Sequence, residues 1–151
     1  MRYSQIRSID ISNGVGVACS IFFQGCGHRC FNCFNKETWD FSGGYEFTKD
    51  MQNEFIELCK KPYIDCVSIL GGEPLQQHRA EFSDFLAILQ SINKPIYLWS
   101  GYTYEEIMNS DNSYVLEKID YLIDGKYVEE LKDYTLKLRG SSNQRIITIN
   151  H

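Results

Sequence analysis

The sequence has no uninterrupted apolar run of the roughly 18 residues that a membrane-spanning helix needs. Its first residues, MRYSQIRSID, are polar and lack the apolar stretch of a secretory signal peptide. We therefore expect a cytoplasmic location and no membrane partner.

Positive charge is also scarce. The chain has 15 Lys and Arg against 20 Asp and Glu, which gives a formal net charge of −5 and a pI of about 5.2. Binding along a nucleic-acid backbone requires a basic face. The composition therefore disfavours a nucleic-acid partner, although a small basic patch is compatible with it.

Internal repeats, low-complexity runs and linkers are missing as well, and a length of 151 residues suits one domain with one core. Hydrophobic residues make up 43% and charged residues 23% of the chain, as expected for a soluble globular protein. We expect residues 1–151 to form a single domain.

What the sequence does contain is an alternation of strand and helix patterns. Short apolar or β-branched runs predict strands. Apolar residues at helical spacing predict two helices, and capping residues mark the start of the first helix (Thr48) and of a third (Thr103 with Glu106). The predicted strands are 17–23, 63–70, 95–99, 119–123 and 145–149, and the predicted helices are 49–61, 79–92 and one that begins near Tyr104.

This alternation implies parallel βαβ units and an α/β fold class. A complete eightfold βα barrel takes about 250 residues, which is more than the chain has. The sequence therefore favours an incomplete (partial) βα barrel or an open α/β sheet.

Polar or glycine-rich stretches follow four of the predicted strands in turn: QGCGHRC, GGEP (71–74), SGY (100–102) and DGK (124–126). In parallel α/β folds, the loops at the carboxyl ends of the strands share one edge, and ligands bind there. We expect these four stretches to meet at one site.

A second cysteine knuckle is absent, and this limits the kinds of metal site. Cys26, Cys30 and Cys33 have the spacing C-x3-C-x2-C. Structural zinc sites usually join two knuckles into a closed tetrahedron. Three thiolates suit a cubane [4Fe–4S] cluster instead and leave one iron open to a small ligand. A zinc loop with a distant fourth ligand is the alternative.

The other three cysteines are scattered along the chain, at Cys19, Cys59 and Cys66. A free cysteine packs as a small hydrophobic residue, so we interpret these three as core residues. His28, between two of the predicted ligands, is interpreted as a packing residue of the loop, with ligation of the cluster as the alternative.

Several stretches together resemble a known family. They are DISNGVG, GCGHRCFNCFNKETW, GGEP, WSGY, LIDGKYVEELKD and LRGSSNQ, and they run from about Asp10 to Gln144. They resemble the activating proteins of anaerobic (class III) ribonucleotide reductases, which belong to the radical S-adenosylmethionine (SAM) superfamily. Asn32 departs from the superfamily pattern, which commonly has an aromatic residue just before the third cysteine.

The resemblance implies an oxidoreductase of the radical SAM type with a partial βα barrel. The open iron would chelate the amino and carboxylate groups of SAM, and an electron from the cluster would cleave the sulfonium C–S bond. The 5′-deoxyadenosyl radical would then take hydrogen from a glycine of anaerobic ribonucleoside-triphosphate reductase. The implied electron donor is a low-potential protein such as flavodoxin.

The resemblance also implies which residues bind the cofactors, while no side chain is expected to act as the catalyst. The implied metal ligands are Cys26, Cys30 and Cys33. The implied SAM contacts are Asn32, Cys33, Phe34, Gly71, Gly72, Glu73, Asp124 and Lys126.

Other interpretations stay open at this point. The chain could activate a different glycyl-radical enzyme, or it could be an iron–sulfur or zinc module without chemistry of its own. Asp124 and Lys126 also fit an ordinary strand-end turn with solvated charges. The stretch LRGSSNQ could serve partner docking or closure of the site.

Overall fold

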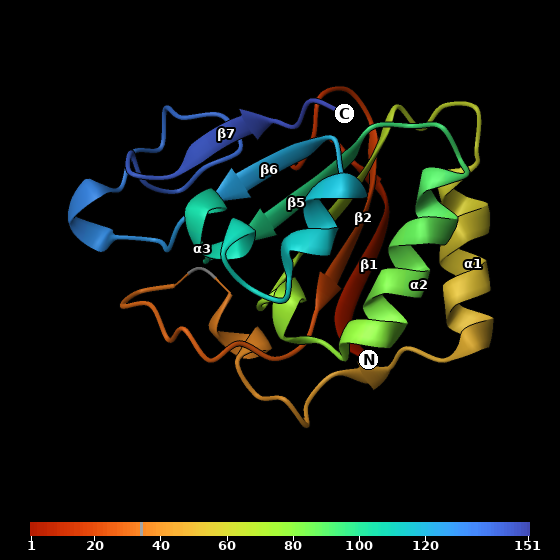
Figure 1. Cartoon of the computed structure of the whole chain (residues 1–151), viewed down its shortest axis with the longest axis horizontal. Coiled ribbons are helices and arrows are strands. Elements are labelled where there is room, and N and C mark those ends of the chain that lie inside the picture. Colours follow the sequence, from red (N-terminus) through yellow and green to blue (C-terminus); the bar gives the residue numbers. More distant parts are fainter. Residues whose placement is uncertain (34) are drawn as a thin grey trace.

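Four parallel strands form the centre of the sheet. The computed structural model describes residues 1–33 and 35–151, and in this part of the chain the sheet has the order β3-β1-β2-β4-β5-β6-β7 (Figure 1). The parallel strands are β2 (Ala18–Phe23), β4 (Cys66–Gly71), β5 (Ile96–Ser100) and β6 (Tyr121–Asp124). The prediction of an α/β fold with parallel βαβ units is confirmed for this centre.

The outer strands make the sheet mixed rather than wholly parallel. They are β1 (Arg2–Asp10), β3 (Tyr45–Glu46) and β7 (Arg145–Thr148). Strand β1 pairs antiparallel with both β2 and β3, and β7 pairs antiparallel with β6. The sequence predicted β7 but neither β1 nor β3, because β1 carries polar residues on both faces and β3 has only 2 residues.

The helices begin at the residues that the sequence predicts, and the predicted capping threonines precede the first and the third helix. The helices are α1 (Lys49–Cys59), α2 (Arg79–Gln90) and α3 (Tyr104–Met108), with short 3₁₀ helices η1 (Lys36–Thr38), η2 (Pro74–Gln76), η3 (Ser113–Glu117) and η4 (Glu129–Leu131). Thr48 Oγ1 accepts a hydrogen bond from the Met51 amide before α1. Thr103 and Glu106 form the predicted capping box before α3.

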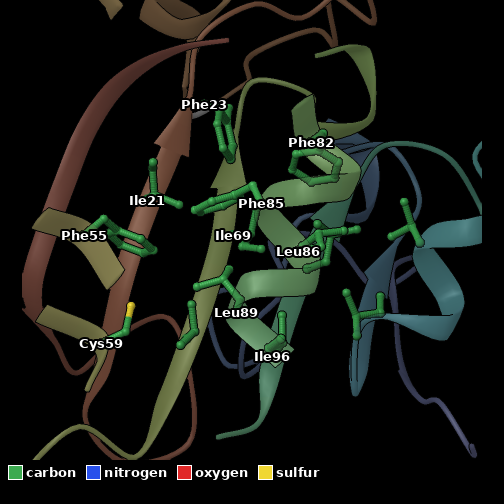
Figure 2. Close-up of a cluster of buried hydrophobic side chains, with 14 of the residues drawn as sticks. Ile21, Phe23, Phe55, Cys59, Ile69, Phe82, Phe85, Leu86, Leu89 and Ile96 are labelled. Atoms are coloured by element: carbon green, nitrogen blue, oxygen red, sulfur yellow. The ribbon is translucent and has the colours of Figure 1, made fainter. Parts of the chain in front are cut away.

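The main core lies between one face of the sheet and the helices. Figure 2 shows Phe23 and Ile69 from the sheet packed against Phe55 of α1 and Phe85 and Leu89 of α2, and all five are fully buried. Each such side chain contributes about 1.5–3 kcal/mol by leaving water. The periodic apolar residues predicted for both helices therefore do form this core.

The opposite face of the sheet carries a smaller cluster of Ala18, Cys66, Tyr97 and Ile123. Beyond it, the loops at the carboxyl ends of the parallel strands gather at one end of the molecule. In Figure 1 the arrowheads of β2, β5 and β6 point towards this end, where the orange loop that follows β2 also lies. Among the described residues, no helix has both the length and the apolar character needed to cross a membrane.

Candidate iron–sulfur centre

The three predicted metal ligands lie in the loop that follows β2. The described part of this loop, residues 24–33 and 35, is attached at its start, where the amides of Gly25 and Cys26 donate hydrogen bonds to the carbonyl oxygens of Thr38 (2.6 Å) and Trp39 (3.2 Å). Because the loop has little regular structure of its own, contacts with other segments fix its course.

All three thiol-bearing residues of this loop line one cavity of about 530 Å³. Ligand pockets in proteins commonly measure about 300–1,000 Å³. The strand-end loops after β4, β5 and β6 supply other parts of the wall: Gly71, Gly72, Ser100, Gly101, Gly125 and Lys126. The sequence-based expectation that these loops meet beside the cysteines therefore agrees with the structure.

The remaining cysteines lie elsewhere. Cys19 and Cys59 are fully buried in the main core, and Cys66 packs in the smaller cluster on the other face of the sheet. None of these three is on the wall of the cavity. The cavity therefore offers three cysteine thiols among the described residues, as their spacing predicts.

This donor set fits a [4Fe–4S] cluster. Thiolates are the usual protein ligands of such clusters, and each thiolate binds a separate iron, so three thiols that face one cavity are a suitable arrangement. In the described part of the chain, no three His, Cys, Asp or Glu side chains converge on a position for a single metal ion.

Burial and nearby hydrogen-bond donors shift the pKa values of Cys26 and Cys30 in opposite directions. Burial raises the pKa of the Cys26 thiol above its ordinary value, and a hydrogen bond from the His28 amide partly offsets it. Burial likewise raises the pKa of Cys30, whereas a hydrogen bond from the Tyr127 amide and the charge of Lys126 act to lower it. Since thiolates are the ligands, binding of a metal group here would release protons.

The two glycines of GGEP lie where the loop after β4 touches the cysteine loop. A Cβ on Gly72 would lie 2.7 Å from the carbonyl oxygens of both Gly25 and Phe23, and one on Gly71 would lie 2.6 Å from the Phe23 oxygen. The absence of side chains is therefore required by close packing of the backbone. Both glycines also line the cavity.

Glu73 does not lie on the cavity wall. It is fully buried, and its carboxylate accepts hydrogen bonds from the amides of Gly101 (2.7 Å) and Leu75 (3.0 Å) and from Ser100 Oγ (3.0 Å to each oxygen). His28 Nε2 is 2.7 Å from Glu73 Oε1. The structure thus places this predicted SAM contact behind the cavity rather than in it.

The two predicted residues of the DGK turn have different surroundings. Asp124 is 1% exposed, lies 2.5 Å from the guanidinium of Arg145 and accepts from the Tyr104 amide at 2.7 Å. It is therefore not a solvated charge, and its carboxylate is already paired. Lys126, in contrast, lines the cavity and is exposed.

The two predicted contacts just before and after Cys33 are not both described. Asn32 is exposed, has a positive φ of 56° and is not among the residues that line the cavity. Phe34 lies outside the described residues.

Two further segments help to enclose the cavity: no role in the site was predicted for the first, and partner docking or site closure was predicted for the second. One follows β1 and contributes Ser12 and Asn13, and the other is residues 136–144, which includes the whole of LRGSSNQ. Two hydrogen bonds attach the second segment to the strand ends. Trp99 Nε1 donates to the carbonyl oxygen of Leu138 over 2.8 Å, and Gln144 Nε2 donates to the carbonyl oxygen of Gly125 over 2.9 Å. The family resemblance singled out this second segment, and the structure shows that it closes one side of the cavity.

The charge of the cavity wall is opposite to that of the chain as a whole. Its charged side chains among the described residues are the cations Arg7, Lys126 and Arg139, whereas the chain has a formal net charge of −5. A cluster held by thiolates and a ligand carboxylate both gain from nearby positive charge. The wall is therefore suited to an anionic group.

Comparison with known proteins agrees with this site. A family model described as "4Fe-4S single cluster domain" matches residues 12–147. The fold and the site thus define the chain as a protein with a single [4Fe–4S] cluster domain.

Curated relatives narrow this class further. The anaerobic ribonucleoside-triphosphate reductase-activating protein of Salmonella typhimurium is 41% identical over 151 residues, which cover 95% of this chain and 96% of the relative. The protein of the same name from Escherichia coli K12 is 40% identical, and the match covers 95% of this chain and 96% of the relative. The protein of the same name from enterobacteria phage T4 is 37% identical, and the match covers 97% of this chain and 93% of the relative. The chain belongs to the family of anaerobic ribonucleoside-triphosphate reductase-activating proteins.

Proposed function

We propose that residues 1–151 form one radical SAM domain with an incomplete βα barrel. This domain would activate anaerobic ribonucleoside-triphosphate reductase in the cytoplasm by generating a glycyl radical on it. The observation that carries the proposal is the convergence of Cys26, Cys30 and Cys33 with the loops after β4, β5 and β6 on one cavity. A fourth cysteine is missing from the described part of its wall, which leaves room for a non-protein ligand on one iron.

The three thiols would hold the [4Fe–4S] cluster. When bound, the cluster would supply one electron to cleave the sulfonium C–S bond of SAM, giving methionine and a 5′-deoxyadenosyl radical that takes a hydrogen atom from the glycine. The chain itself binds, orients and shields these groups. Apolar side chains of Phe22, Leu70, Trp99, Ile123, Leu136 and Leu138 line the cavity and make part of its wall apolar.

The methionine part of SAM would lie beside Gly71 and Gly72, because these residues line the cavity where the β4 loop meets the cysteine loop. Lys126 would attract the SAM carboxylate, since its side chain is exposed at the wall. Glu73 and Asp124 would contribute indirectly, because protein donors already surround both carboxylates. Asn32 and Phe34 remain proposed contacts from the cysteine loop.

The substrate would be a glycine-bearing loop of the reductase. The names of the relatives contain this partner, and a cavity open to the surface can admit a protein loop that completes its walls. The electron would come from a low-potential donor such as flavodoxin. Docking would also shield the radical from water and reductant.

The test uses the anaerobically purified chain with a strong reductant, SAM and the reductase. We expect about four iron per chain, an EPR signal of the reduced cluster that changes when SAM is added, and 5′-deoxyadenosine together with a glycyl radical on the reductase. The matched control is a reductase in which the radical-bearing glycine is replaced by alanine. A cluster signal indifferent to SAM would indicate a mere electron carrier, and a radical on another glycyl-radical enzyme only would indicate a different partner.

A further inference from the structure

The carboxylate of Glu73 has no exposed surface, and protein donors occupy it from several sides. It accepts from two backbone amides and from Ser100 Oγ, and it lies 2.7 Å from His28 Nε2. A buried carboxylate is tolerated only when such donors surround it. To bind the amino group of SAM, Glu73 would have to give up some of these bonds and reach a wall that it does not line.

His28 connects this carboxylate to the cysteine loop. It lies between Cys26 and Cys30, and its side chain is only 7% exposed. The edge of its ring meets Tyr102 with centroids 4.6 Å apart. A Cβ on Gly101 would lie 2.6 Å from His28 Cδ2, so the ring fills the space left by a glycine. The side chain is therefore confined to one position.

Residues between Cys26 and Cys30 reach the neighbouring strand-end loops through two such bonds. His28 Nε2 bonds Glu73, and the amide of Gly27 donates to Gln76 Oε1 at 2.8 Å. Both partners belong to the segment that follows β4. The His28 bond is the one that ends on a fully buried group, so it gives the turn a rigid attachment point.

We infer that Glu73 is a positioning residue that acts through His28, and that it does not itself bind the amino group of SAM. It fixes the turn between Cys26 and Cys30, and so the relative position of two of the three thiols. The inference rests on the proposed cluster at these cysteines and deepens that proposal. In this proposal Glu73, although it belongs to a strand-end motif beside the cavity, helps to position the cysteine ligands of the cluster and does not contact SAM.

The test compares variants of the full chain after anaerobic reconstitution. The rate of iron loss to an excess of a ferrous chelator reports cluster retention, and the SAM-induced change of the EPR signal gives the SAM Kd of the clusters that remain. The variants are His28→Phe, Glu73→Gln, both together, and His28→Gln, which keeps an N–H donor near the position of Nε2. His151→Phe, at the far end of the chain, is the control.

We expect His28→Phe and Glu73→Gln each to lose iron about tenfold faster than the unaltered chain, as loss of a hydrogen bond to a buried charged group predicts. The double variant should be no worse than the more damaging single one, because both changes act on the same bond: His28→Phe removes its donor and Glu73→Gln removes the charge of its acceptor. His28→Gln should restore retention to within about threefold, and loaded Glu73→Gln should bind SAM with a Kd within about threefold of normal.

The opposite pattern would overturn the inference. Normal iron retention in Glu73→Gln with SAM binding weakened more than about tenfold would make Glu73 a SAM ligand. Independent effects in the double variant would also contradict it. If His28→Phe does not fold, Gly101→Ala displaces the ring from the other side and should accelerate iron loss in the same way; normal retention in that variant counts against the inference. An unaltered chain without a cluster would instead overturn the proposed function.

Discussion

The carbonyl oxygen of Gly25 accepts a hydrogen bond from the backbone amide of Glu73 over 2.8 Å. This bond joins the start of the cysteine loop to the loop after β4, and Gly72 packs against the same carbonyl. The thiols and the proposed SAM-binding wall are therefore held together by direct backbone packing. Changes at this junction should affect the fold as well as the cofactors.

Replacement of Cys30 by alanine should abolish a stable cluster, because Cys30 is one of three thiols on the cavity wall. Iron should fall to background, and 5′-deoxyadenosine formation should stop. The matched variant is Cys66→Ala, in which the thiol removed is packed in the smaller apolar cluster and does not line the cavity. It should keep its iron and lose about 1 kcal/mol of unfolding free energy. Full iron content in Cys30→Ala would show that Cys30 is not a ligand of the cluster.

Gly72→Ala should destabilise the protein even without a cluster. The added Cβ would lie 2.7 Å from backbone oxygens of Gly25 and Phe23, which cannot easily move. We expect urea unfolding of the cluster-free chain to show a loss of about 1–3 kcal/mol. In Gly27→Ala the new Cβ would meet only the Gln76 side chain, at 3.5 Å, so the change should stay within about 0.5 kcal/mol. Equal effects of the two substitutions would argue against the packing explanation.

Arg145→Gln should be more destabilising than a typical surface substitution, because it leaves the buried carboxylate of Asp124 without its cation. The expected loss is about 1–3 kcal/mol in urea unfolding, reduced from the value for a fully buried pair because Arg145 is half exposed. Lys132→Gln, which breaks an exposed pair with Glu129, is the control and should cost less than about 1 kcal/mol. A neutral Arg145→Gln would show that Asp124 does not need its partner.

Asp10 should make stability depend on pH in the acid range. Burial acts to raise the pKa of Asp10, but hydrogen bonds from Asn13 and Ser12 outweigh it and hold this pKa below the ordinary value. As pH falls, the unfolded chain therefore binds the proton first, near its pKa of about 3.9. The contribution of Asp10 is fully present above that pH and is lost as pH falls through the lower pKa of the folded state.

The variant Asp10→Asn should accordingly be less stable than the unaltered chain at neutral pH and should show a shallower loss of stability below about pH 5. Urea unfolding of the cluster-free chain at a series of pH values measures this slope. Asp84→Asn, on the exposed side of α2, provides the comparison. Identical slopes for Asp10→Asn and the unaltered chain would mean that the bonds to Asp10 do not favour its charged form.

Local pattern was sufficient for most of the central fold. The apolar residues of α1 and α2, their caps and the short apolar strands lie within a few residues of one another, so the sequence displays them directly. Strand β1 was missed for the opposite reason. Its residues become a strand by pairing with β2 and β3, and register shifts between Tyr3 and Gln5 and between Arg7 and Asp10 interrupt any simple alternation.

The sequence alone determined the three thiols, their shared loop and the glycine-rich strand ends around them, because ligand chemistry and spacing are local properties of the chain. The tertiary structure decided what surrounds each group. Residues 136–144 close the cavity, and the carboxylates of Glu73 and Asp124 turn away from it, to His28 and Arg145 respectively. His28 is 45 residues from Glu73 in the sequence, and Arg145 is 21 residues from Asp124. A carboxylate pairs with the donors that folding brings next to it, so these partners cannot be predicted from the local sequence.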